Sequence, residues 1–113
     1  MTKEEQKSYM VSILEKIVNI PSPSGYTKEV MAALVAEAQS MGYHVEYNHK
    51  GGIIILVPGK SEQVLGLGAH GDTLGAMVRS VTKEGYLKIF PVGGYMMSTI
   101  EGEYCRIHCR RNG

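Results

Sequence analysis

The spacing of apolar residues changes at Gly42, and this change constrains the fold more than any other feature of the chain. Before Gly42, apolar residues recur every three or four positions, which predicts amphipathic helices near residues 4–19 and 26–41. Pro21 disfavours helical geometry at Ile20 and so ends the first helix, while Gly42 is a natural stop for the second. The predicted buried faces are Tyr9, Met10, Ile13, Leu14, Ile17 and Val18 in the first helix, and Val30, Met31, Leu34, Val35, Ala38 and Met41 in the second.

The next segment has the pattern of strands. Residues 43–48 alternate between apolar and polar, which predicts a strand with one wet face, and His44 and His49 are expected at the surface. The apolar runs at 52–58 and 64–69 are continuous, which predicts two strands of a sheet that helices cover on both sides. The first part of the chain is therefore expected to be α/β.

The pattern changes again after Asp72, where no further helix is evident. Two units are therefore expected: residues 1–72 as the N-terminal part of an α/β domain, and residues 73–113 as an incomplete β-rich domain. Asn112-Gly113 is a hairpin signal with no returning strand, which indicates either a chain that stops in mid-structure or a frayed tail. The short strands predicted in the second unit are 75–81, 86–92 and 102–110.

Composition argues against several function classes. The chain has 113 residues, of which 43% are hydrophobic and 20% charged, as is typical of one small globular domain. The formal net charge is +1 and no basic run exceeds Arg110-Arg111, so no nucleic-acid surface is indicated. No apolar run approaches the ~18 residues of a membrane span, and the N-terminal stretch is polar, unlike a signal peptide. We therefore expect a cytoplasmic protein with no membrane partner.

Cys105 and Cys109 lie close to His108, but their spacing does not suit a zinc site. In a strand the two thiols would share one face about 13 Å apart, while His108 would point to the other face. That geometry excludes both a local disulfide and a local metal site. We expect buried, reduced thiols, because free cysteine packs as a small hydrophobic residue.

His70 and Asp72 form the pair with the clearest chemistry. A neutral imidazole is a good ligand for a divalent metal, and a carboxylate that accepts its other N–H fixes the tautomer. His70 is the candidate ligand and Asp72 its candidate partner, expected close together at the C-terminal end of a strand, where α/β sheets bind ligands. The same residues would also suit a turn whose aspartate caps main-chain N–H groups.

Three stretches carry a resemblance to a known family: "PSPSG" at 21–25, "AHGDTLG" at 69–75 and Gly-Gly at 93–94. Together they resemble the N-terminal part of the M42 metallo-aminopeptidases, the glutamyl and deblocking aminopeptidases whose relatives include proteins named endoglucanases. The resemblance covers nearly the whole chain. It is far more specific than the His-x-Asp spacing alone.

This resemblance implies a peptidase whose two divalent ions, zinc, cobalt or manganese, activate water against a peptide carbonyl. It makes His70 the first metal-binding histidine and Asp72 the catalytic carboxylate that orients this histidine without binding metal. The residues after Asp72 would begin an inserted β-domain that shapes homo-oligomers. Because the family is several times longer, its other ligands would lie beyond Gly113. The chain is thus expected to be an N-terminal fragment that binds no metal tightly and is inactive alone.

Two alternative interpretations stay open. The run "HGDT" also fits the M20 carboxypeptidases and deacylases, although the flanking "LGAMVRSV" and "GYLKIFPVGG" resemble the M42 continuation more closely. The other alternative is a non-catalytic β-rich interaction module, in which His70 and Asp72 serve only a turn.

Overall fold

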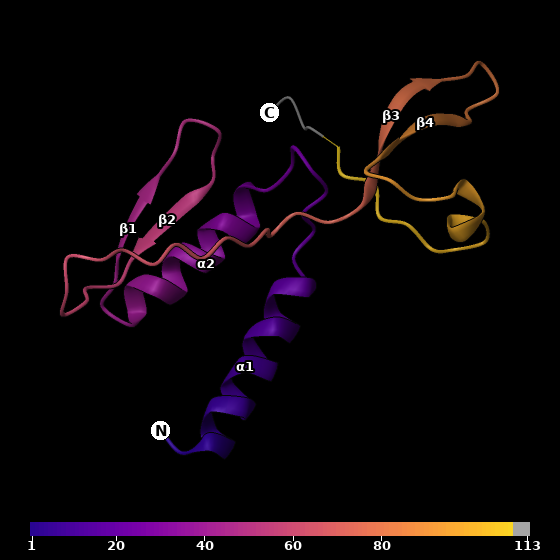
Figure 1. Ribbon diagram of the computed structural model, residues 1–113. Helices are drawn as coiled ribbons and strands as arrows, with labels where there is room; N and C mark the ends of the chain where they lie inside the picture. The colour runs from indigo at the N-terminus through magenta and orange to yellow at the C-terminus, as the bar shows by residue number, and fades with distance from the viewer. Residues whose placement is uncertain (110–113) are drawn as a thin grey trace.

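The computed structural model describes residues 1–109 (Figure 1). Helix α1 spans Lys3–Val18 and helix α2 spans Lys28–Ser40, which confirms the two predicted helices. A capping box begins α1: the Thr2 hydroxyl accepts the Glu5 N–H across 3.2 Å, and the Glu5 carboxylate accepts the Thr2 N–H across 2.7 Å.

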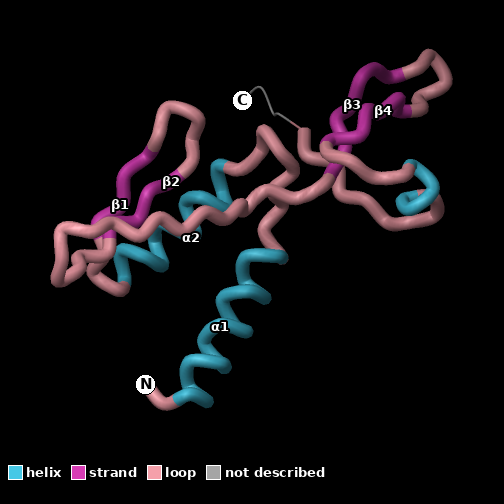
Figure 2. Tube along the Cα trace, viewed as in Figure 1, coloured by secondary structure: helices cyan, strands magenta, loops and turns pink. Residues whose placement is uncertain are grey.

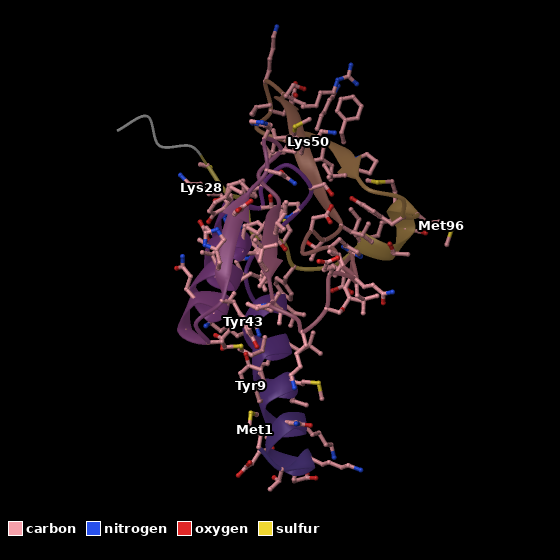
Figure 3. All side chains as sticks on the ribbon, turned by 60° about the vertical axis from the view of Figure 1, so that its left-hand side comes forward. Met1, Tyr9, Lys28, Tyr43, Lys50 and Met96 are labelled. Atoms are coloured by element: carbon pink, nitrogen blue, oxygen red, sulfur yellow. The ribbon has the colours of Figure 1, made fainter. Side chains whose placement is uncertain are left out.

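Fewer apolar side chains of the two helices are buried than the sequence predicts. Among the described residues, the buried apolar side chains are Val30 and Ala38, both on α2. Helix α1 touches α2 through the Tyr9 hydroxyl, which donates to Glu37 Oε1 across 2.9 Å. Because α1 lies against one neighbouring helix only, most of its surface meets solvent (Figures 1 and 3). The predicted core residues that are exposed instead are Met10, Leu14, Val18 and Met41.

A two-stranded hairpin follows α2 and lies against it (Figure 1). Gly42 ends the helix region as predicted, with a φ of 84° that a residue with a Cβ adopts only with strain. Strand β1, His44–Tyr47, pairs antiparallel with strand β2, Ile53–Leu56, with Val45 opposite Ile55. His44 and His49 are exposed, as predicted.

The prediction of two strands covered on both sides is wrong. Within residues 1–109, β2 lies in a sheet of two strands, and Ile54 and Leu56 remain 47% and 48% exposed. Residues 64–69 are not a strand, and Leu67 is 90% exposed. A continuous apolar run records a tendency to be buried, but a strand also needs a neighbour for its main-chain N–H and C=O groups. No strand of the described residues pairs with 64–69.

The second sheet is also a hairpin, and it forms where the sequence predicts it. Strand β3, Gly75–Val81, pairs antiparallel with strand β4, Leu87–Val92, with an irregularity between Val78 and Ser80. The two sheets lie at opposite ends of the molecule (Figure 2). The chain is therefore of mixed α and β structure, with each described sheet antiparallel and two-stranded.

The segment after β4 departs from the prediction. A short 3₁₀ helix, η1, spans Met97–Ile100, and Met96 just before it projects outward (Figure 3). The predicted strand at 102–110 is absent from its described part, 102–109, so no sheet covers the thiols of Cys105 and Cys109. Both thiols are free and exposed, and the prediction of buried thiols is wrong. The hairpin signal at 112–113 lies outside the described residues.

The overall shape is extended, measuring 62 × 34 × 30 Å with a radius of gyration of 18.4 Å. A compact domain of 100 residues has a radius of about 13 Å, so this chain leaves much of its apolar surface uncovered. Neither α1 nor α2, the helices of the described range, has the length and apolar character needed to cross a membrane.

Candidate functional site

The site forms where the turn after α1 meets the segment that leads into β3. The Thr73 N–H donates to the Ser22 carbonyl oxygen across 2.8 Å, and Pro23 and Thr73 form an isolated parallel bridge. Ser22 is 2% exposed. A Cβ on Gly75 would lie 2.5 Å from the Pro23 Cβ, so only glycine allows this approach. The turn is therefore held against the residues that follow His70.

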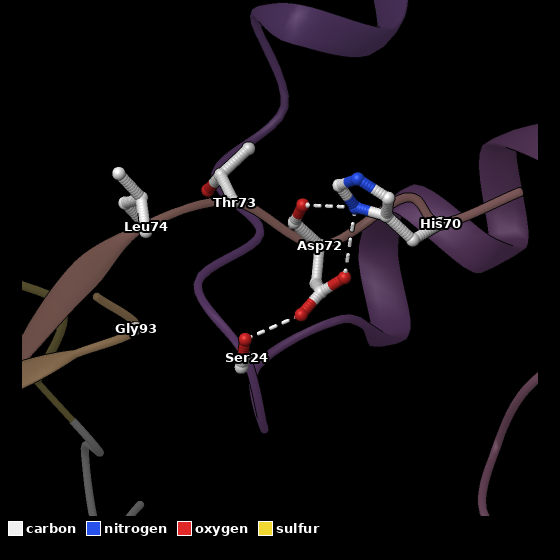
Figure 4. A pocket seen from close by; sticks show the side chains of 6 residues that line it. All are labelled: Ser24, His70, Asp72, Thr73, Leu74 and Gly93. Atoms are coloured by element: carbon white, nitrogen blue, oxygen red, sulfur yellow. Dashed lines mark hydrogen bonds and ion pairs between the residues drawn. The ribbon is translucent and has the colours of Figure 1, made fainter. Parts of the chain in front are cut away.

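His70 and Asp72 contact each other in this segment (Figure 4). His70 Nδ1 lies 3.1 Å from Asp72 Oδ1 and 3.0 Å from the Asp72 main-chain oxygen. This confirms that the two side chains lie within hydrogen-bond distance. Their predicted position at the end of a strand is wrong, because residues 64–69 before His70 form no strand.

These contacts assign the tautomer of the neutral ring. A carbonyl oxygen and an ionised carboxylate oxygen both accept hydrogen bonds, so Nδ1 must carry the hydrogen. The lone pair of neutral His70 is then on Nε2, which points away from Asp72 (Figure 4). The His70 side chain is 84% exposed, so this lone pair is available to a ligand.

The second oxygen of Asp72 is also occupied. The Ser24 hydroxyl donates to Asp72 Oδ2 (Figure 4). This hydrogen bond, helped by a main-chain hydrogen bond at Asp72 and then by the charge and hydrogen bond of His70, outweighs desolvation and holds the pKa of Asp72 below its ordinary value of 3.8. Asp72 is therefore ionised at neutral pH and accepts from both neighbours.

The sequence does not identify Ser24 as a site residue. The Pro-Ser-Pro-Ser-Gly stretch predicts a turn and carries part of the family resemblance, but nothing local in it indicates a partner far along the chain. One signal could have pointed to Ser24. Its hydroxyl lies in a turn that carries the family resemblance together with the stretch that contains His70 and Asp72. Only the fold brings the two stretches together.

An open cavity of about 620 Å³ borders this cluster. Its size falls in the range of small-molecule pockets. Gly93, of the Gly-Gly pair that carries the resemblance, has a φ of 91°, and a Cβ there would lie 2.4 Å from Cδ2 of Leu74. The lining residues are Ser24, His70, Asp72, Thr73, Leu74 and Gly93 (Figure 4).

The side chains of this site offer one free donor atom to a metal ion. Nε2 of His70 is free to coordinate, whereas both Asp72 oxygens accept hydrogen bonds from His70 and Ser24. Catalytic zinc sites have three protein ligands and an open position. Residues 1–109 contain no group of three or more histidine, cysteine or acidic side chains placed to hold an ion. These residues would thus supply one ligand together with the carboxylate that orients it.

Comparison with known proteins gives a family match. A family model described as M42 glutamyl aminopeptidase matches residues 51–113. A putative aminopeptidase of Bacillus subtilis, YhfE, is 41% identical over 98 residues, or 86% of this chain. The lysyl aminopeptidase of Pyrococcus furiosus is 30% identical over 95 residues, or 83% of this chain. The glutamyl aminopeptidase of Lactococcus lactis is 28% identical over 92 residues, or 80% of this chain.

These relatives are much longer than the aligned region. The match covers 28% of the Bacillus protein, 27% of the Pyrococcus protein and 26% of the Lactococcus protein. The chain therefore spans a little over a quarter of the length of these relatives. Neither the M20 interpretation nor the interaction-module interpretation is favoured by these matches.

Proposed function

The chain belongs to the M42 glutamyl aminopeptidase family, and on this premise we propose that it forms the N-terminal part of a metal-dependent aminopeptidase. The complete enzyme would remove residues from the amino ends of peptides. The observation that carries the proposal is the contact between His70 Nδ1 and Asp72 Oδ1, because it leaves Nε2 as the ring's free donor atom.

Each residue of the pair has one role in this proposal. His70 would bind one of two divalent ions, zinc, cobalt or manganese, through Nε2. Asp72 would keep the hydrogen on Nδ1, hold the ring in place and raise its basicity, without itself binding the ion. When bound, such ions polarise a peptide carbonyl and lower the pKa of a coordinated water.

The proposal also covers the organisation of the chain. Residues 1–72 would belong to the catalytic domain and residues 73–113 to an inserted β-rich domain that takes part in homo-oligomers. The separation of the sheets supports this division, since β1 pairs with β2 and β3 pairs with β4. A cytoplasmic location is part of the proposal, and free, exposed thiols suit a reducing compartment.

A hybrid enzyme tests the proposal directly. This chain would replace the aligned segment of the Pyrococcus lysyl aminopeptidase, with which it is 30% identical. With zinc, cobalt or manganese supplied, we expect the hybrid to hydrolyse lysyl p-nitroanilide. The His70→Ala hybrid should fall to the background rate, because it lacks the imidazole that would hold the ion.

His44 provides a matched control for this substitution. It is also an exposed histidine paired with a carboxylate, since Nε2 lies 3.2 Å from Glu46 Oε1. The His44→Ala hybrid should keep its activity. A folded hybrid without activity, or one that keeps its activity after His70→Ala, would contradict the proposed function.

A further inference from the structure

We propose that Ser24 is a positioning residue for the His70–Asp72 pair. Its hydroxyl holds the Asp72 carboxylate in the orientation that keeps the hydrogen of neutral His70 on Nδ1. The importance of this role for catalysis rests on the function proposed above. The geometry itself involves only residues of this chain.

Ser24 is a well-placed donor because the residues before it are fixed. The Ser22 carbonyl accepts a hydrogen bond from the N–H of Thr73 across 2.8 Å, and Thr73 is the residue that follows Asp72. Within the turn, the Tyr26 N–H donates to the Pro23 carbonyl across 2.7 Å. The turn is therefore closed on itself and tied to the Asp72 segment at the same time.

The carboxylate needs such a restraint. Asp72 is 39% exposed, so packing alone does not fix the rotation of its carboxylate. The Ser24 hydroxyl donates to Oδ2 while His70 Nδ1 lies 3.1 Å from Oδ1, so each oxygen has one partner. Two partners on opposite oxygens define the plane of the carboxylate. Without the hydroxyl, Asp72 can turn toward water, and Nδ1 of His70 loses its charged acceptor.

The tautomer of His70 reports this role without any need for enzymatic activity. Nitrogen NMR of the histidine-labelled chain measures the ratio of Nδ1–H to Nε2–H forms of the neutral His70 ring. The His70 signal is assigned by comparison with His70→Gln. We expect Nδ1–H to dominate in the unmodified chain. In Ser24→Ala, the ratio should move toward Nε2–H by about two- to fivefold, the effect of weakening one hydrogen bond.

Two further variants separate the hydroxyl from the shape of the side chain. Ser24→Thr keeps the hydroxyl and should retain the original tautomer ratio. Ser24→Cys is close in size but has a weak donor, so its ratio should lie near that of the alanine variant. Ser12→Ala is the matched control, because Ser12 is an exposed serine whose hydroxyl donates to the Tyr9 carbonyl, on α1. Amide spectra of α2 check that each variant keeps the fold.

The outcomes separate this inference from the proposed function. A folded Ser24→Cys chain with an unchanged His70 ratio would overturn the positioning role, as would equal shifts in the threonine and cysteine variants. Neither result would affect the activity expected of the hybrid enzyme. If His70 responds to Ser24 but the hybrid is inactive, the positioning role stands and the proposed function does not.

Discussion

The Thr73 N–H donates to the Ser22 carbonyl oxygen across 2.8 Å and joins the turn after α1 to the residues that lead into β3. Thr73 also lines the cavity of the candidate site, so this link lies at the edge of the site. It brings the Ser24 hydroxyl to the Asp72 carboxylate, and Asp72 in turn contacts His70. The site thus depends on how two distant parts of the chain dock.

Gly75→Ala should disturb this docking. A Cβ at this position would lie 2.5 Å from the Pro23 Cβ, and both the proline ring and its main chain resist displacement. We expect a loss of about 1–3 kcal/mol in the free energy of unfolding, as for other overpacked sites. Urea denaturation measures this loss. Gly66→Ala is the control, because a Cβ there has no neighbour within 4 Å and should change stability little.

Asp72→Asn should weaken metal binding through His70 in the hybrid enzyme. The amide keeps the size of the side chain but removes the charge that stabilises the Nδ1–H form. Loss of a carboxylate behind a metal-binding histidine lowers metal affinity or activity by about 10- to 100-fold. The change is measured by titrating the hybrid with metal and recording its rate of hydrolysis at each metal concentration. Glu46→Gln beside His44 should have no such effect, and an equal decrease in both variants would count against the assignment.

Tyr9 should make the stability of the fold sensitive to alkali. Desolvation, followed by the hydrogen bond and negative charge of Glu37, raises the pKa of Tyr9 above its ordinary value of 10.0. The protonated phenol is favoured in the folded chain, so its contribution is complete below pH 10.0 and is lost as the pH rises through the raised pKa. Tyr9→Phe should remove this part of the pH dependence. Denaturation curves at several alkaline pH values test it, and an identical alkaline decline in both proteins would refute it.

The 113-residue chain by itself should not hydrolyse peptides. It would contribute one imidazole ligand, and a catalytic site needs three protein ligands and an open position for water. The purified chain is assayed on aminoacyl and glutamyl p-nitroanilides with zinc, cobalt or manganese. No metal-dependent turnover is expected. Turnover that disappears in His70→Ala would show that these residues assemble a complete site.

The local features of the fold were accessible from the sequence. Both helices, the strands at 43–48 and 52–58, and the hairpin strands at 75–81 and 86–92 follow from periodicity and turn residues over short windows. The contact between His70 and Asp72 was also accessible, because the two residues are close in sequence and flanked by small residues. Such features depend on interactions between near neighbours.

Tertiary structure decided the features that need a distant partner. The run at 64–69 is as apolar as a strand, yet it is unpaired, because strand formation depends on a neighbour for its main-chain groups. The thiol of Cys105 is exposed because residues 102–109, as far as the structure describes this segment, form no strand. Ser24 reaches Asp72 only because Ser22 and Gly75 let two segments approach closely. Periodicity records which residues avoid water, whereas pairing and docking depend on which surfaces meet.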